Sequence, residues 1–239
     1  MTQAMPKHVL LNNVDHKNLR VITTHSAEYG DDVMFAVTFP GEFRSVQTHY
    51  PIVFRKTADA QFQPVALFGF EERQNLFLGR AGWEANYVPL AIERLPFLIG
   101  KSNGELMMHV DLESPRISTT AGEALFREHG GTTDFLDRMN STLLAIHEGL
   151  ASTPAFAEAL LELDLLESFV FDAQLADGSQ NRLVGFYTVN EERLASLAGS
   201  TLERLNRAGY LQALYMAIAS LSHFRELIER RNRAHAGDL

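Results

Sequence analysis

The 239-residue chain contains no cysteine, only one tryptophan and no long hydrophobic run. The absence of cysteine excludes disulfides, thiolate metal sites and cysteine nucleophiles. No apolar stretch approaches the ~20 residues that a membrane-spanning helix needs. Residues 1–21 also lack the apolar core, preceded by positive charge, that is typical of a secretory signal. We therefore expect a cytoplasmic protein that is not inserted into a membrane.

Positive charge is also scarce. The chain has 21 Lys and Arg against 30 Asp and Glu, which gives a formal net charge of -9. Affinity for nucleic acid depends largely on clustered basic side chains, so we expect no nucleic-acid partner. The same balance disfavours electrostatic attachment to a membrane surface.

The remaining composition is that of a folded globular protein, with 46% hydrophobic and 21% charged residues. Short β-branched segments separated by turn signals predict strands in residues 1–115. One predicted hairpin pairs residues 50–56 with 62–70, and Pro64 should lie at the start or edge of its strand. From residue 133 to 239 apolar residues recur mainly with helical spacing.

Four local signals in the second half are specific. Asn190, followed by Glu191 and Glu192, is a candidate N-cap for a helix. Thr133 is a candidate N-cap for a helix over residues 134–150, and Thr153-Pro154 predicts the start of a further helix. Asp177-Gly178-Ser179 predicts a hairpin between residues 169–175 and 183–189. We expect a single α+β domain over residues 1–239, with a mostly antiparallel sheet in its β-rich first half. The mainly helical second half contains one further hairpin, which can join that sheet.

The most unusual segment lies between Phe43 and Phe97. It holds ten of the chain's aromatic residues, which are 16 Phe, 6 Tyr and one Trp, and four of its eight prolines. Large rings on a proline-stiffened backbone can form a core or a rigid recognition surface. On the second interpretation a ligand or partner is bound by rings together with arginines that can hold a carboxylate. These candidates are Tyr50, Trp83, Tyr87, Tyr187, Arg44 and Arg55, with His16 as a further candidate.

A possible metal site lies in the run His109-Val110-Asp111-Leu112-Glu113. On a strand the three polar side chains alternate with Val110 and Leu112 and therefore share one face. A histidine and two carboxylates can bind a divalent metal, which predicts a metal-dependent enzyme as the alternative function. A polar strand face turned to water explains the same alternation.

Other catalytic patterns are weak. His16 with the adjacent Asp15 can form an acid–base couple, although loop residues of this kind also bond to the backbone. Gly100-Lys101-Ser102 lacks the upstream glycine of a phosphate-binding loop and is interpreted as a turn. The residues indicate no cofactor.

An ordered series of short motifs resembles the bacterial SapC family over nearly the whole chain. The motifs are His16-Lys17-Asn18-Leu19-Arg20-Val21, Glu42-Phe43-Arg44, His49-Tyr50-Pro51-Ile52-Val53-Phe54, Pro64-Val65-Ala66-Leu67-Phe68-Gly69-Phe70, Asn75-Leu76-Phe77, Trp83, Tyr87-Val88-Pro89, Leu95-Pro96-Phe97, Leu125-Phe126, residues 185–194, Gly209-Tyr210-Leu211 and Ser220-Leu221.

The resemblance implies an association with surface-layer systems or peptide transport. Genes of this family also neighbour TonB-dependent receptors and flavin-dependent halogenase-like proteins, in systems that take up sugars or peptides. The resemblance supplies no catalytic residues. We therefore expect a non-catalytic accessory or binding protein with a peptide or protein partner, and a chain without a signal sequence suits that role better than a surface-layer building block.

Overall fold

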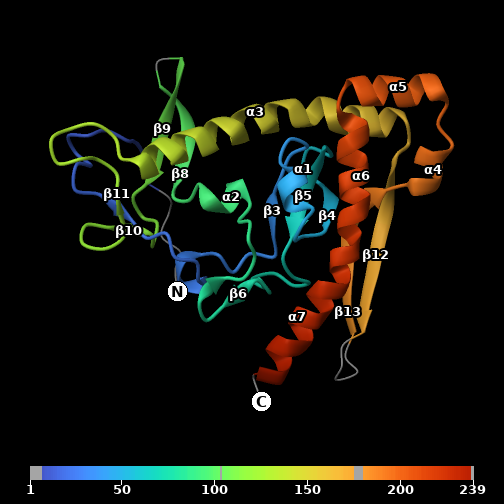
Figure 1. Ribbon diagram of the computed structural model, residues 1–239, viewed down its shortest axis with the longest axis horizontal. Helices are drawn as coiled ribbons and strands as arrows, with labels where there is room; N and C mark the ends of the chain where they lie inside the picture. Colours follow the sequence, from blue (N-terminus) through green and yellow to red (C-terminus); the bar gives the residue numbers. More distant parts are fainter. Residues whose placement is uncertain (1–6, 103, 175–179, 238–239) are drawn as a thin grey trace.

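The computed structural model describes residues 7–102, 104–174 and 180–237. It confirms the α+β prediction: the described strands pair antiparallel, and the second half is mainly helical (Figure 1). The largest sheet has the order β12-β13-β4-β5-β3. Its strands are β3 (Phe35–Val37), β4 (Ile52–Lys56), β5 (Phe62–Leu67), β12 (Leu166–Gln174) and β13 (Gln180–Val189).

The predicted hairpin is formed by β4 and β5, but Pro64 lies inside β5 and opposite Phe54. Its carbonyl accepts a hydrogen bond from Thr38 N at 3.1 Å, just beyond the last β3 pair, Val37 with Val65. In an antiparallel strand the N–H and C=O of one residue point to the same side. The missing N–H of Pro64 therefore faces Thr38 at the end of β3, so the proline removes only the last bond of that ladder.

The second hairpin joins the sheet of the first half, as predicted. Phe186 and Tyr187 of β13 pair with Arg55 and Phe54 of β4. The pairing of β12 with β13 is irregular between Phe169 and Phe171, where Gly185 on the opposite strand has φ +86°. A positive φ favours glycine at such a bulge. The predicted turn Asp177-Gly178-Ser179 lies outside the described residues.

A smaller region packs beside this sheet. It contains one three-stranded sheet in the order β1-β9-β8 and another in the order β10-β2-β11, whereas the ribbon of β6 and β7 packs through Trp83 against the core beside the five-stranded sheet. The predicted turn at Gly100-Lys101-Ser102 is wrong, because these residues continue β8 in register with β9. The strands are β1 (His8–Leu10), β2 (Arg20–Val21), β6 (Leu78–Gly79), β7 (Gly82–Trp83), β8 (Phe97–Ser102), β9 (Glu105–Asp111), β10 (Ile117–Ser118) and β11 (Glu123–Ala124).

Helix α3 (Asp134–Glu162) runs along both regions (Figure 1). Thr133 caps it as predicted, because its hydroxyl accepts from Leu136 N at 3.3 Å. The predicted break at Thr153-Pro154 is wrong, since Pro154 lies within the helix. The Thr153 hydroxyl donates to the Gly149 carbonyl at 2.8 Å, one turn earlier, and so does not act as an N-cap.

The other helices are short or lie at the C-terminal end. Asn190 caps α4 by accepting from Arg193 N at 2.8 Å, as the sequence indicates. Their bounds are α1 (Phe43–Val46), α2 (Leu90–Glu93), α4 (Glu191–Ala195), α5 (Gly199–Arg207), α6 (Tyr210–Ser220) and α7 (Phe224–Gly237), with 3-10 turns at Ala27–Tyr29 and Leu221–His223. Within the described ranges no helix is both long and apolar enough to cross a bilayer.

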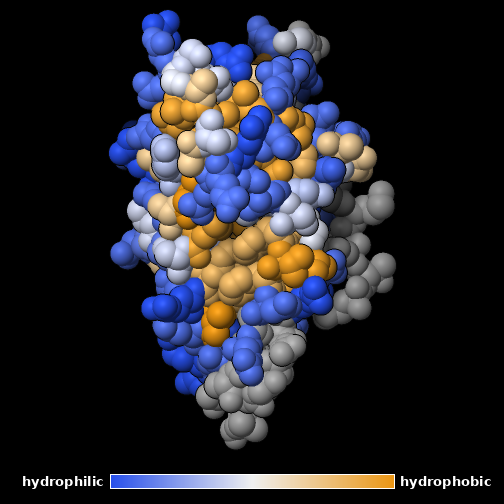
Figure 2. All heavy atoms as spheres, turned by 90° about the vertical axis from the view of Figure 1, so that its right-hand side faces the viewer, coloured by the Kyte–Doolittle hydropathy of each residue, from blue (hydrophilic) through white to orange (hydrophobic). Residues whose placement is uncertain are grey.

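The buried hydrophobic residues form two clusters. The larger cluster lies between the five-stranded sheet, α6 and the second half of α3. The smaller one lies between β8, β9, β2 and the first half of α3. The side of the molecule that carries β12, α4 and α5 shows apolar surface (Figure 2), and Val170 and Val184 of the β12–β13 hairpin are 48% and 57% exposed there.

Candidate functional site

Tyr50 belongs to the core. Its side chain is 0% exposed, and its ring contacts Phe68, Phe77 and Trp83 edge-to-face, with centroids 5.2, 4.7 and 6.4 Å away. The prediction that Tyr50 lines a recognition surface is therefore wrong. The physical reason is that its hydroxyl finds partners inside the protein, so the ring can be buried completely.

Those partners come from the same aromatic segment. Trp83 Nε1 donates to the Tyr50 hydroxyl at 2.7 Å, and that hydroxyl donates to the Tyr87 carbonyl. Burial raises the pKa of Tyr50, so the phenol stays neutral. Trp83 and Tyr87 are partly buried against the larger core cluster. The aromatic and proline residues thus serve mainly as core here.

Glu42 is a buried acid that the sequence interpretation missed. It is 4% exposed and accepts hydrogen bonds from Thr38 Oγ1, Tyr87 Oη and Leu90 N at 2.7, 2.9 and 2.7 Å. Burial raises the pKa of Glu42 although these three donors oppose the shift. The carboxylate joins β3, α1 and the start of α2, which fixes the position of α2.

The remaining predicted binding residues are spread over the molecule. Tyr187 packs edge-to-face on Phe62 at 4.8 Å, and the Arg55 guanidinium lies 4.9 Å from the Phe35 ring centre. Arg44 is exposed and lines a separate hollow beside α6. Tyr187 and Arg55 therefore hold the sheet together. None of the hollows described here is lined by all of the predicted binding residues.

The predicted metal ligands do not converge. The His109 ring covers Gly100 on the neighbouring strand, where an added Cβ would lie 2.5 Å from it. Asp111 Oδ1 accepts from the backbone N–H groups of Lys7 and Glu113 at 2.8 and 3.1 Å, and Glu113 lies beyond the end of β9. Within the described part of the chain no three His, Asp or Glu side chains are placed to hold a metal ion. The strand thus uses these polar groups for packing and for a turn.

The predicted acid–base couple, His16 and Asp15, stabilises a loop. His16 is buried, and its Nδ1 accepts from Asn12 N at 3.1 Å. Asp15 Oδ2 accepts from Asn12 Nδ2 at 2.9 Å. Both side chains therefore bond to Asn12, as expected of residues that stabilise a turn.

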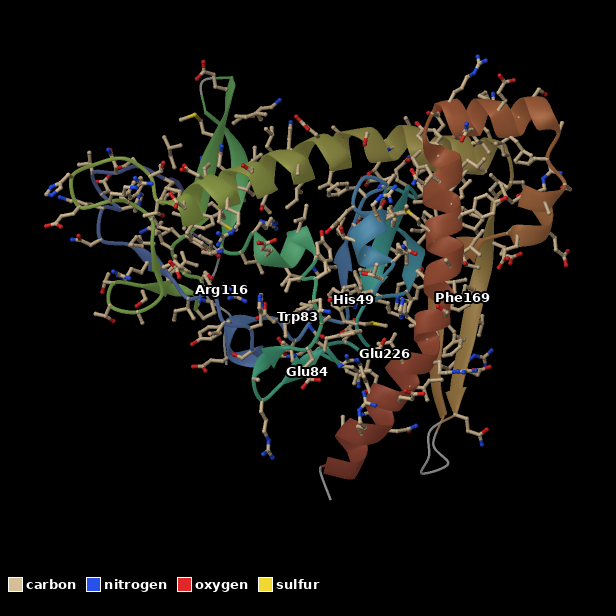
Figure 3. The ribbon with its side chains drawn as sticks, viewed as in Figure 1. His49, Trp83, Glu84, Arg116, Phe169 and Glu226 are labelled. Atoms are coloured by element: carbon tan, nitrogen blue, oxygen red, sulfur yellow. The ribbon has the colours of Figure 1, made fainter. Side chains whose placement is uncertain are left out.

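A charged cluster joins α7 to the β6–β7 ribbon. Arg230 is paired with Glu84 at 3.1 Å and Glu226 at 3.0 Å, and it lies 4.3 Å from the Phe77 ring centre. Figure 3 shows Glu84, Glu226 and His49 in this part of the molecule. Burial lowers the pKa of His49. The cluster fixes the last helix against the aromatic core.

A cavity of about 310 Å³ lies beside α2. One wall is the loop between β2 and β3, another is α2, and the third is the first half of α3. Of the residues predicted to bind a ligand or partner, Tyr87 alone lines it. The lining residues are Thr23, His25, Asn86, Tyr87, Val88, Ile92, Glu93, Leu95, Arg116, Phe135, Arg138 and Met139.

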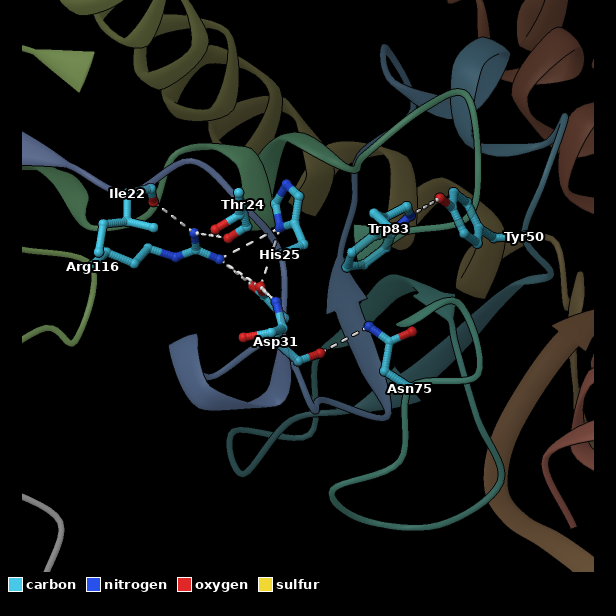
Figure 4. A network of polar contacts seen from close by, with 9 residues as sticks. Ile22, Thr24, His25, Asp31, Tyr50, Asn75, Trp83 and Arg116 are labelled. Carbon is cyan, nitrogen blue, oxygen red and sulfur yellow. Dashed lines mark hydrogen bonds and ion pairs between the residues drawn. The ribbon is translucent and has the colours of Figure 1, made fainter. Parts of the chain in front are cut away.

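A buried ion pair supports the first wall. Asp31 and Arg116 are 0% and 2% exposed, and Arg116 Nη2 lies 2.6 Å from both carboxylate oxygens (Figure 4). Arg116 Nη1 donates to the carbonyls of Ile22 and Thr24 at 3.0 Å. One guanidinium therefore fixes the strand end, the loop and the carboxylate together. Among the described groups its buried Nε has no hydrogen-bond partner.

The ion pair orients His25. Its Nδ1 lies 3.2 Å from Asp31 Oδ2 and 3.4 Å from Arg116 Nη2. Asp31 Oδ2 is the closer of these two atoms and, as a carboxylate oxygen, can only accept a hydrogen bond. We therefore place the Nδ1 proton toward Asp31, and Nε2 is then the basic nitrogen. Figure 4 shows Nε2 pointing away from Asp31. The ring is also held by an edge-to-face contact with Trp83 at 5.4 Å.

The charge of Asp31 is stabilised. Burial alone would raise the pKa of Asp31, but the hydrogen bond from His25 and the charge and hydrogen bonds of Arg116 outweigh burial and lower it. The sequence gives little sign of this site. Arg116 lies in a loosely patterned segment, and a histidine, an aspartate and an arginine at such separations form no motif.

The cavity also has charges of both signs at its edges. Glu93 is on α2, and Arg138 is exposed on α3, with its guanidinium 5.5 Å from the Phe135 ring centre. A carboxylate and a guanidinium on different walls can hold an ammonium and a carboxylate of one ligand. The apolar side chains of Val88, Ile92 and Met139 lie between them.

A family model described as SapC matches residues 11–227. The chain belongs to the SapC family. The region shared with SapC contains every residue that lines this cavity, together with Asp31. Comparison with curated proteins and with solved structures found no match.

Proposed function

We propose that this SapC protein is a non-catalytic binding protein and that the cavity beside α2 holds its ligand. The observation that carries the proposal is a 310 Å³ cavity with Glu93 and Arg138 on separate walls. Small-molecule sites are typically concave, mostly apolar and provided with a few fixed polar groups. This cavity is concave and has about as many polar as apolar residues in its lining, which suits a ligand with charged ends.

The charges favour a zwitterionic ligand. Arg138 suits a carboxylate, Glu93 suits an ammonium, and His25 offers a hydrogen-bonding nitrogen whose orientation is fixed by Asp31. An amino acid or a short peptide carries both groups at its ends. Its side chain can pack on the apolar residues of α2 and α3.

The setting that we propose follows from the family resemblance. A cytoplasmic accessory protein that binds a peptide would serve peptide or sugar uptake through TonB-dependent receptors, or a surface-layer system. A peptide or protein partner and flavin-dependent halogenase-like proteins are the associated components. Co-purification from the native host with mass spectrometry tests these partners separately from the ligand.

Titration calorimetry tests the ligand. We expect saturable binding of amino acids or dipeptides and much weaker binding of neutral sugars. Glu93→Gln and Arg138→Gln should each weaken binding about tenfold, the effect of one lost charge-assisted hydrogen bond. Arg127→Gln is the matched control, because Arg127 is exposed near the start of α3, where it pairs with Asp134 at 2.8 Å, and it does not line the cavity. Binding that is unchanged in both cavity variants contradicts the proposal.

The Asp31–His25 pair favours a second candidate, acid–base chemistry. A histidine oriented by a buried carboxylate, with its other nitrogen free to act, is the arrangement used for proton transfer. Mass spectrometry of a bound peptide after incubation separates the two functions. An unchanged peptide supports binding alone, whereas turnover that His25→Gln abolishes without loss of affinity establishes the second candidate.

A further inference from the structure

A second cavity, separate from the proposed ligand site, lies between β8, β9 and the middle of α3. Its volume is about 360 Å³. Most of its lining is aliphatic, so it favours an apolar ligand group. The aliphatic lining residues are Leu98, Ile99, Leu106, Leu143, Ile146 and Leu150.

Arg94 brings a cation to this apolar lining. It follows the last residue of α2, is partly buried, and donates from Nη1 to the Phe97 carbonyl at 2.6 Å. Among the described residues no carboxylate lies within ion-pair distance of its guanidinium. Burial lowers the pKa of Arg94, and no neighbouring charge offsets this effect. A partly buried arginine without an anion is costly, which indicates a missing negative group.

The other charged or titratable residues that line this cavity are also basic. Lys101 and His147 line the cavity and are exposed at its mouth. Among the described residues no Asp or Glu lines it, although the chain has 30 acidic residues against 21 basic ones. The local charge is therefore opposite to the net charge of the protein, and an anion is attracted here specifically.

We propose that this cavity binds a carboxylate with an aliphatic tail, such as a medium-chain fatty acid. The tail packs on the leucine and isoleucine side chains of β8, β9 and α3. The carboxylate accepts hydrogen bonds from the Arg94 guanidinium, which can donate through two parallel N–H groups. Lys101 and His147 draw the carboxylate toward the mouth.

The lining favours a fatty acid over a peptide. A peptide carries an amide at every residue, and each amide placed against aliphatic side chains without a partner costs free energy. An alkyl chain has no such groups. Because a peptide, like a fatty acid, ends in a carboxylate, the experiment must include a peptide whose last residues are apolar.

Titration calorimetry with decanoate, at concentrations below micelle formation, tests the proposal. We expect saturable binding of one decanoate per chain. Decanol lacks the charge and acetate lacks the tail, so each should bind at least about tenfold more weakly. Decanol that binds as tightly as decanoate, an apolar-ended peptide that binds more tightly, or non-saturable uptake would each overturn it.

Variants locate the site. Arg94→Gln should weaken decanoate binding about tenfold, whereas the control Arg225→Gln on the exposed side of α7 should not change it. If Arg94→Gln unfolds, two other variants test the site: Leu106→Gln and the double variant Lys101→Gln/His147→Gln. All three positions are exposed, so these substitutions should leave the fold intact. Each should reduce affinity, and unchanged affinity in both overturns the proposal. Amino-acid binding beside α2 should be the same in all these proteins.

Discussion

The indole Nε1 of Trp83 donates to the hydroxyl of Tyr50 at 2.7 Å, and this contact joins the β6–β7 ribbon to the segment that precedes β4. The Tyr50 hydroxyl in turn donates to the Tyr87 carbonyl. Both polar atoms of the two large rings are thereby satisfied inside the protein. The contact explains how so many aromatic residues can be concentrated in one segment and still form a core.

Tyr50→Phe should destabilise the fold. The substitution leaves the Trp83 N–H and the Tyr87 carbonyl without this partner, and we expect a loss of about 1–3 kcal/mol in the free energy of unfolding. Urea denaturation measures the loss, and the fluorescence of Trp83, the single tryptophan, reports its new environment. Tyr215→Phe is the control because Tyr215 is 56% exposed. Equal stability of both variants would show that the hydroxyl contributes nothing.

Arg116→Met should be far more damaging than removal of a surface arginine. It leaves the Asp31 charge buried without its cation, which typically costs about 3–5 kcal/mol. Arg73→Met is the matched control, because Arg73 pairs at 2.8 Å with Asp32, the residue after Asp31, but is 84% exposed. The free energy of unfolding of this control should fall by only about 0–1 kcal/mol. Chemical denaturation of the two variants gives the comparison.

The pH dependence of stability tests whether the buried charge of Asp31 causes the loss of stability in Arg116→Met. Its pKa is lower in the folded protein than in the unfolded chain, so its stabilising contribution is present above the unfolded pKa. That contribution is lost as pH falls through the folded pKa. The stability gap between the wild type and Arg116→Met should therefore narrow in acid. A gap that is constant with pH points to lost packing alone.

Glu42→Gln should stabilise the protein at neutral pH. Burial raises the pKa of Glu42, so the ionised carboxylate lowers stability at pH values above its folded pKa. Glutamine keeps an oxygen for Tyr87 and Leu90, and its amide can donate to the Thr38 hydroxyl. The advantage of glutamine should shrink as pH falls through the folded pKa of Glu42, because the acid then becomes neutral.

Glu42→Ala separates charge from hydrogen bonding. It leaves the Tyr87 hydroxyl and the Leu90 N–H without their acceptor, and we expect a loss of about 2–4 kcal/mol at neutral pH. Thermal unfolding across a pH series compares the two variants. A destabilised glutamine variant at neutral pH would mean that the charge itself contributes favourably.

Ser220→Ala should destabilise, whereas Ser222→Ala should not. Ser220 is 0% exposed, and its hydroxyl accepts from Ile52 N at 2.8 Å and donates to the Ala217 carbonyl. Alanine leaves the Ile52 N–H of the sheet buried and unpaired, at a cost of about 1–3 kcal/mol. Ser222 bonds one turn back in the same way but is exposed. Hydrogen exchange of the Ile52 amide should accelerate in the first variant only.

Local signals in the sequence predicted the elements that depend on local contacts. Thr133 and Asn190 cap helices where their side chains indicate, and β4 and β5 flank the expected loop. The break expected at Pro154 did not occur. Packing of Phe156 and Leu160 into the larger core outweighs the loss of one backbone hydrogen bond at the proline.

The candidate site depends on contacts between residues distant in the chain, and the sequence pattern did not reveal it. Asp31 and Arg116 are separated by 85 positions, and Glu42 meets Leu90 across 48. Neither pair has a periodicity or a motif that marks it. The His109 run illustrates the converse, since alternation on a strand predicted a shared face but could not show that Gly100 lies beneath the ring.

Helix α3 connects the two cores in a single rod of 29 residues, because Phe135 and Met139 belong to one cluster and Phe156 and Leu160 to the other. The rod is weakest where Pro154 cannot supply a backbone donor, one turn after Gly149 meets the Phe39 ring. A bend of α3 at this point would move one core relative to the other. The cavity beside α2 is lined by Ile92 of the larger cluster and by Phe135 and Met139 of the smaller one, so such a bend would change its width.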